Sequence, residues 1–153
     1  MPNTYSQMYV QVVIVVKHRQ ALIQKQWKDE LYKFITGTIT NKGQKLLRIN
    51  GIENHIHILI NIKPNIALSD LMRDIKANSS RWINEQKFGN HKFEWQEGFG
   101  AFTYSKSQLD NVIKYIDNQE EHHKKQSFKE EYLSFLKKFE VDYKMEYLFD
   151  FLE

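Results

Sequence analysis

The chain has 153 residues, of which 41% are hydrophobic and 27% charged, a composition typical of a globular domain with its own hydrophobic core. It contains no cysteine, which excludes disulfides and thiolate chemistry. No stretch reaches the roughly 18 apolar residues of a membrane span, and the first six residues lack the pattern of a secretory signal. A cytoplasmic protein is therefore expected.

The net charge is only +3, but it is unevenly distributed along the chain. Residues 17–48 contain eight lysines and arginines against two acids, whereas residues 129–153 contain four lysines against seven acids. A basic front and an acidic tail suit an anionic partner such as nucleic acid. An unevenly charged, solvated surface explains the same distribution equally well.

The first half of the chain contains three strand patterns and one helix pattern. Residues 9–16 are rich in β-branched side chains and predict a buried strand. Residues 24–38 predict a helix, because their large apolar side chains recur every three or four positions. Residues 45–52 and 53–62 predict two further strands, which a turn at Glu53-Asn54 joins into a hairpin.

The second half is mainly helical. Residues 68–86 predict an amphipathic helix, and residues 101–104 a fourth strand. A single helix is expected over 108–123, followed by another over 128–139. The aromatic-rich segment 141–153 is expected to pack back on the domain or on a partner.

The order strand, helix, strand, strand, helix, strand is that of an α+β, ferredoxin-like split βαβ fold. This fold is an antiparallel sheet with helices on one face, here extended by C-terminal helices. We expect one domain over residues 1–153, with a core at about 5–125 and a helical tail at about 126–153. The opposite sheet face is expected to be open.

Two histidines lie near the middle of the chain on a predicted strand. His55 and His57 are two residues apart, so their side chains project from the same face of the strand. Two imidazoles held in this way can supply two ligands of a metal site. His-x-His alone is a weak signal, because most such pairs are structural.

A polar stripe follows on the predicted helix 108–123. Tyr115 and Gln119 are four residues apart and therefore share a face of that helix. Tyrosine can act as a covalent nucleophile, and a metal on phosphate oxygens stabilises charge that develops during phosphodiester cleavage. His55, His57 and the Gln119 amide oxygen would provide three ligands and leave positions open for phosphate and water.

The remaining histidines and tryptophans have simpler interpretations. His122 and His123 are adjacent on a helix and diverge by about 100°, so a solvated pair is expected. Trp27 and Trp82 lie on apolar helix faces and are expected in the core. For Trp95 the sequence leaves two interpretations open, packing in the core or facing DNA.

His-hydrophobic-His on a strand, followed by Tyr-x-x-x-Gln on a helix, resembles the HUH single-tyrosine transposases of the insertion-sequence 200/605 type. These include the relatives associated with repetitive extragenic palindromes. The segments 9–19, 54–60, 95–102 and 112–123 are similar to successive parts of that family. The resemblance covers most of residues 5–150.

This resemblance implies a homodimeric enzyme that cleaves and rejoins single-stranded DNA beside hairpins. Tyr115 would be the nucleophile and would form a 5′-phosphotyrosine intermediate. His55, His57 and Gln119 would bind a divalent metal, Mg²⁺ or Mn²⁺; two imidazoles favour Mn²⁺. Whether Tyr115 serves its own subunit or the partner's stays open. Backbone phosphates could be bound by five basic residues: Lys17, Arg19, Arg73, Lys76 and Arg81.

Two other functions remain as alternatives. A ferredoxin-like sheet can bind single-stranded nucleic acid without any chemistry, although no ribonucleoprotein-type aromatic motif lies on the predicted strands. Another HUH nuclease, such as a replication initiator, would share the metal and tyrosine motifs. The short chain and the Tyr-x-x-x-Gln spacing favour the transposase.

Overall fold

The computed structural model describes residues 3–153, so Met1 and Pro2 of the expected domain lie outside it. Its centre is one antiparallel sheet with the strand order β2-β3-β1-β4. The strands are β1 (Tyr9–Val15), β2 (Lys45–Ile52), β3 (His55–Asn61) and β4 (Gly100–Tyr104). The α+β, ferredoxin-like arrangement expected from the sequence is confirmed.

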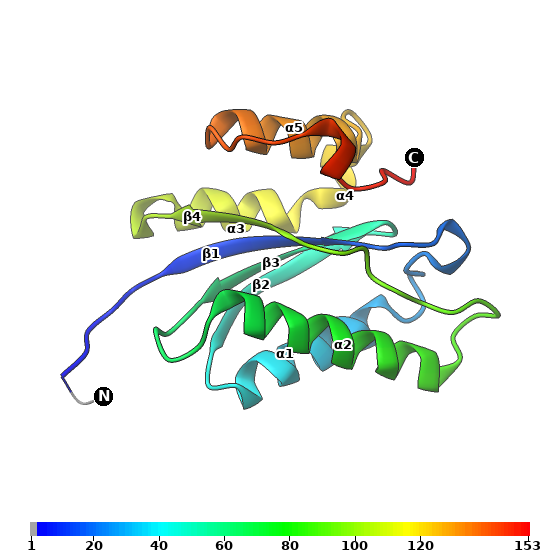
Figure 1. The fold of residues 1–153 in the computed structure, drawn as a ribbon, viewed down its shortest axis with the longest axis horizontal. Helices are drawn as coiled ribbons and strands as arrows, with labels where there is room; N and C mark the ends of the chain where they lie inside the picture. The colour runs from blue at the N-terminus through cyan, green and yellow to red at the C-terminus, as the bar shows by residue number, and fades with distance from the viewer. Residues whose placement is uncertain (1–2) are drawn as a thin grey trace.

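Helices cover both faces of this sheet (Figure 1). The α-helices are α1 (Lys28–Asn41), α2 (Leu68–Gln86), α3 (Leu109–Asp117), α4 (Gln119–His123) and α5 (Phe128–Lys138). Short 3₁₀ turns are η1 (Arg19–Ala21), η2 (Lys106–Gln108) and η3 (Met145–Tyr147). Helices α1 and α2 lie on one side of the sheet, while α3, α4 and α5 lie on the other. The expectation that this second face is open was therefore wrong.

The two central strands are buried on both faces, and their side chains alternate between two packing layers. On β3, Ile56, Ile58 and Ile60 join the apolar cluster formed with α1 and α2. Leu59 points the other way and packs against Val112 and Ile116 of α3. Because His55 and His57 alternate with the isoleucines, both imidazoles project into the layer between the sheet and the C-terminal helices.

A tight hairpin between β2 and β3 fixes the register of the histidine strand. Ile52 pairs with His55 and Asn50 with His57. A side chain at Gly51 would collide with the backbone of His55, so only glycine allows the two strands to approach this closely. The hairpin predicted from residues 45–62 is thus confirmed.

The single helix expected over residues 108–123 is interrupted. Helix α3 ends at Asp117, Asn118 has the non-helical dihedrals φ −98° and ψ 21°, and α4 begins at Gln119. Asparagine is a weak helix former whose side chain competes for backbone hydrogen bonds, which suits it to this break. Tyr115 and Gln119 consequently belong to two successive helices, on either side of Asn118.

The C-terminal segment packs against α5, as expected from its aromatic content. Leu148, Phe149 and Phe151 contact the apolar cluster of that helix. The Glu153 carboxylate accepts hydrogen bonds from the backbone amides of Phe128 and Lys129, at 2.7 and 2.9 Å. These are unpaired donors of the first helical turn, so the chain end caps the helix that lies over the histidines.

Candidate active site

The two histidines form the floor of a closed site. His55 and His57 are both fully buried, and their rings lie 5.0 Å apart between centroids. Phe128 of α5 stacks on the His55 ring at 3.8 Å with nearly parallel planes. The strand spacing therefore placed both imidazoles on one face as predicted, and α5 covers them.

The His55 ring is oriented by its sequence neighbour. Asn54 donates its amide to the Leu152 carbonyl at 3.3 Å, which turns its own oxygen toward His55. That oxygen lies 2.7 Å from Nδ1 and can only accept a hydrogen bond. Nδ1 therefore carries the proton, and Nε2 points its lone pair into the site.

His57 has a different support. The Gln11 amide lies 2.8 Å from His57 Nδ1, and the Tyr104 hydroxyl lies 2.7 Å from the other end of the same amide. The amide nitrogen is the end that faces Nδ1, and Tyr104 donates to the amide oxygen, so Nδ1 accepts and the ring proton lies on Nε2, toward Glu131 Oε1. Acting as a ligand through Nε2 requires the other tautomer, with the Gln11 amide turned over.

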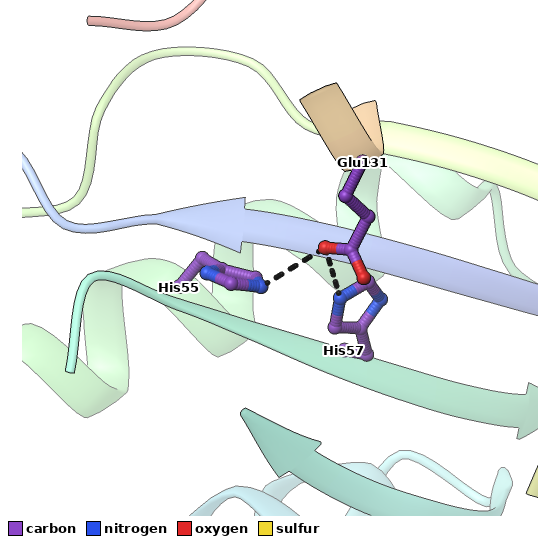
Figure 2. A group of neighbouring side chains, drawn as sticks. All are labelled: His55, His57 and Glu131. Atoms are coloured by element: carbon purple, nitrogen blue, oxygen red, sulfur yellow. Dashed lines mark hydrogen bonds and ion pairs between the residues drawn. The ribbon is translucent and has the colours of Figure 1, made fainter. Parts of the chain in front are cut away.

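A carboxylate that the sequence interpretation had missed completes the site. Glu131 of α5 is 1% exposed and points down at both histidines (Figure 2). Its Oε1 lies 3.1 Å from His57 Nε2 and 3.3 Å from His55 Nε2. Burial acts to raise the pKa of Glu131, but the neighbouring histidines, His57 and His123 foremost, outweigh it and hold that pKa below its usual range. The carboxylate is therefore charged.

The contacts of His55 Nε2 are those expected around a cation. Its lone pair faces Gln119 Oε1 at 3.2 Å and Glu131 Oε1 at 3.3 Å, and both oxygens are acceptors as well. Burial lowers the pKa of His55 to about 4, so the ring gains no second proton at neutral pH. No proton on Nε2 therefore offsets the repulsion between this lone pair and the two oxygens, whereas a bound positive ion would attract all three atoms.

The spacing of the donor atoms also fits a metal. Ligand atoms about 2.1 Å from an octahedral ion lie about 3 Å from their neighbours, close to the contacts described above. Ligand atoms of His55, His57 and Glu131 all lie within 4.8 Å of one another. Two imidazoles with carboxylate and amide oxygens suit Mn²⁺ or a similar divalent ion.

Tyr115 reaches the same carboxylate from α3. Its hydroxyl donates to Glu131 Oε2 and lies 3.2 Å from His122 Nε2. Gln119 donates its amide to Glu131 Oε2 at 3.0 Å. Burial and the charge of Glu131 raise the pKa of Tyr115, so the phenol is protonated in this state. Tyr115, His57 and Gln119 belong to one chain, and the Tyr115 and His57 rings are 6.0 Å apart.

One expectation about other side chains was wrong, and burial decides between the two interpretations of Trp95. His123 is not solvated: its side chain is 6% exposed, and Nε2 contacts Gln119 Oε1 at 3.1 Å and Glu131 Oε1 at 3.2 Å. Gln119 and His123 are four residues apart and share a face of α4, so this histidine faces the site beside Gln119. Trp95 does not face outward either, because it is 8% exposed and donates its indole N–H to Ser79 at 2.9 Å. Trp27 is buried as expected, whereas Trp82 is partly exposed.

The five basic residues considered for phosphate contacts do not gather at one place. Lys17, Arg73 and Lys76 line a shared depression beside α2, which lies on the opposite side of the sheet from Tyr115. Arg19 and Arg81 are not among its lining residues. Burial lowers the pKa of Lys76, whose ammonium donates to the carbonyls of Gln96 and Gly98.

Comparison with known proteins places the chain in a family. The family described as "Transposase IS200 like" matches residues 4–119, which include both histidines, Tyr115 and Gln119. The chain belongs to the IS200-like transposases. This family consists of enzymes that cleave DNA and transfer strands, and the identification agrees with the insertion-sequence 200/605 resemblance.

Individual relatives of this transposase family member are distant. The ISDra2 transposase TnpA of Deinococcus radiodurans is 21% identical over 120 residues, covering 74% of this chain and 84% of the relative. A crystal structure of a transposase-like protein from the same organism has a TM-score of 0.60 at 19% identity, covering 76% of this chain and 94% of that one. A REP-associated tyrosine transposase bound to a REP hairpin has a TM-score of 0.61 at 13% identity, covering 79% and 72%.

The family match ends where the unexpected part of the site begins. Gln119 is its last residue, so Glu131 and all of α5 lie beyond it. Within the described residues, no helix is long and apolar enough to cross a bilayer.

Proposed function

We propose that this transposase cleaves and rejoins single-stranded DNA through a covalent bond to Tyr115. One observation carries the proposal. The Tyr115 hydroxyl and both histidines converge on the single buried carboxylate of Glu131. A module that only binds nucleic acid has no need for a tyrosine beside a closed group of metal-ligating side chains. The membership in a transposase family supports the same conclusion.

In the proposed reaction the Tyr115 oxygen attacks the phosphorus of a phosphodiester. A bond forms between that oxygen and phosphorus, and the bond from phosphorus to the 3′ oxygen breaks. The leaving 3′ oxygen takes up one proton, the equivalent of the one that the phenol gives up, and becomes a 3′-hydroxyl. Tyr115 then carries the 5′ phosphate, and a later attack by a 3′-hydroxyl reverses the step. The phenol proton needs an acceptor, and Glu131 Oε2 and His122 Nε2 are the groups that contact it.

His55, His57, Glu131 and Gln119 would hold a divalent ion, Mn²⁺ or Mg²⁺. Bound there, the ion would polarise the phosphate and stabilise the charge of the transition state. The ligand set differs from the expected one by the addition of Glu131.

The proposed substrate is single-stranded DNA with hairpin ends. A structural neighbour is a transposase bound to a REP hairpin, which supports this substrate class. Lys17, Arg73 and Lys76 are proposed to contact backbone phosphates, with Arg19 and Arg81 as further candidates. A homodimer is proposed from the resemblance to the insertion-sequence 200/605 type.

The proposal is tested by incubating the protein with hairpin-bearing single-stranded DNA from around its own gene. With Mn²⁺ or Mg²⁺ we expect a covalent protein–DNA adduct on a denaturing gel. Tyr115→Phe should remove the adduct, because the nucleophile is lost, while the matched variant Tyr147→Phe, at an exposed position, should retain it. DNA binding without an adduct under any metal would instead support a binding module.

A further inference from the structure

A cavity of about 380 Å³ opens beside Tyr115. Its walls come from β1, β4, α3 and α5, and its base includes Glu131 and Phe135. His55 and His57 are not among its lining residues, so the cavity reaches Tyr115 and Glu131 while both histidines stay covered. Whatever occupies it lies directly next to the proposed nucleophile.

Three of the polar side chains that line this cavity are amides that form few or no hydrogen bonds within the described residues. Gln108, Asn111 and Gln126 all line it. No hydrogen bond involves the Asn111 or Gln126 side chain in residues 3–153, and the Gln108 side chain uses only its oxygen there. Each free amide offers a donor and an acceptor, as the edges of the nucleobases do.

Two aromatic rings and one cation complete the lining. Tyr104 and Phe135 are half-buried and line the cavity, and the Phe135 ring also stacks on Phe102 at 5.0 Å between centroids. Lys138 lies two turns beyond Glu131 on α5, forms no ion pair in the described part of the chain, and holds its ammonium over the Phe139 ring at 5.8 Å. Aromatic side chains, amides without protein partners and an ammonium are the groups that contact an unpaired nucleotide.

We propose that this cavity binds the unpaired nucleotide next to the phosphate that Tyr115 attacks. The proposal rests on the proposed function and adds a place where the protein reads a base. A phosphate at Tyr115 has a nucleoside on each side, and one of them must lie near this opening. The volume of about 380 Å³ leaves room for a nucleotide at this opening.

Photocrosslinking tests the position of this nucleotide without requiring cleavage. Tyr115→Phe protein is mixed with the hairpin DNA, in which one flanking position at a time carries 5-iodouracil. After irradiation, mass spectrometry should find the crosslink from a nucleotide at the cleavage site on the peptides that contain Tyr104 or Phe135. Crosslinks from those nucleotides to other peptides only would overturn the proposal.

This design separates the proposal from the function on which it rests. If wild-type protein forms the tyrosine adduct but no flanking position crosslinks to the cavity, the nucleotide site is wrong and the enzyme is right. If a flanking position crosslinks to the cavity but no adduct ever forms, the site stands and the proposed chemistry fails.

Base discrimination gives a second readout. Cleavage is compared on four substrates that differ only in the base next to the cleaved phosphate. Wild-type protein should prefer one base by about tenfold in kcat/KM, the scale of one good amide–base pair. Asn111→Ala/Gln126→Ala should reduce that preference to within about twofold while hairpin affinity is retained. Asn41→Ala/Gln7→Ala, at exposed amides elsewhere, is the control. An unchanged preference in the cavity variant would contradict the proposal.

Discussion

At the scale of single residues, the protonation of His55 decides what the site can hold. Asn54 fixes the proton on Nδ1, and the other ring nitrogen faces two oxygen acceptors. The same carboxylate that contacts His55 also accepts a hydrogen bond from the Tyr115 hydroxyl, so the proposed ligand and the proposed nucleophile are coupled through one side chain. Glu131 is therefore the residue whose charge matters most for metal binding.

We expect Glu131→Gln to weaken Mn²⁺ binding by at least about tenfold, because the variant keeps the size of the side chain but removes its charge. Isothermal titration calorimetry measures this without DNA or activity. The matched variant Glu146→Gln, at an exposed position in η3, should bind Mn²⁺ like wild type. Equal affinity in all three proteins would show that Glu131 is not a ligand.

The metal-free protein should lose stability as the pH falls from about 6.5 toward 4. Burial lowers the pKa of His55 to about 4 in the folded chain, whereas an unfolded histidine titrates near 6.5. In this window the unfolded chain binds the extra proton and the folded chain does not, so protonation favours unfolding. Urea unfolding at several pH values measures the effect. His55→Gln should flatten this dependence, and an equally steep dependence in the variant would assign it to other groups.

At the scale of elements, α5 and the chain end act together as the cover of the site. Phe128 stacks on His55, Glu131 enters the site one turn later, and Glu153 caps the first turn of the same helix. The cover is therefore positioned by a residue at the very end of the described chain.

Removing this cap should loosen the cover. We expect Glu153→Ala to lower the free energy of unfolding by about 1 kcal/mol, since an N-terminal cap is typically worth that much. Amide hydrogen exchange should quicken most in the first turn of α5, with urea unfolding as the global measure. If exchange in that turn is unchanged, α5 does not depend on Glu153 for its position.

The sequence predicted the strands and the order of elements because these depend on local periodicity, whereas the link between the histidines and Tyr115 rested on the family resemblance. It could not predict Glu131, since Glu130 and Glu131 are adjacent acids in one amphipathic helix and only tertiary packing shows which is buried. His123 was missed for a different reason: it lies four residues after Gln119 and shares its helix face, but it was interpreted only together with its neighbour His122. The omission of Glu131 follows from treating the helices after β4 as separate from the sheet.

At the scale of the whole molecule, the sheet separates the proposed contacts to the DNA backbone from the proposed site of cleavage. The depression lined by Lys17, Arg73 and Lys76 lies beside α2, whereas Tyr115 and its cavity lie under α5 on the opposite side of the sheet. Proposed contacts to the hairpin backbone are thus distant from the chemistry. The buried site between sheet and α5 excludes water, which strengthens charge interactions around a bound ion.

The identity of the residue that becomes attached to DNA tests this account most directly. After reaction with hairpin DNA and Mn²⁺, the protein is digested with nuclease and protease, and the nucleotide-bearing peptide is sequenced by mass spectrometry. We predict a 5′-phosphate linked to Tyr115, on a peptide from α3. Attachment to any other residue, or a 3′-phosphate linkage at Tyr115, would contradict the proposed mechanism.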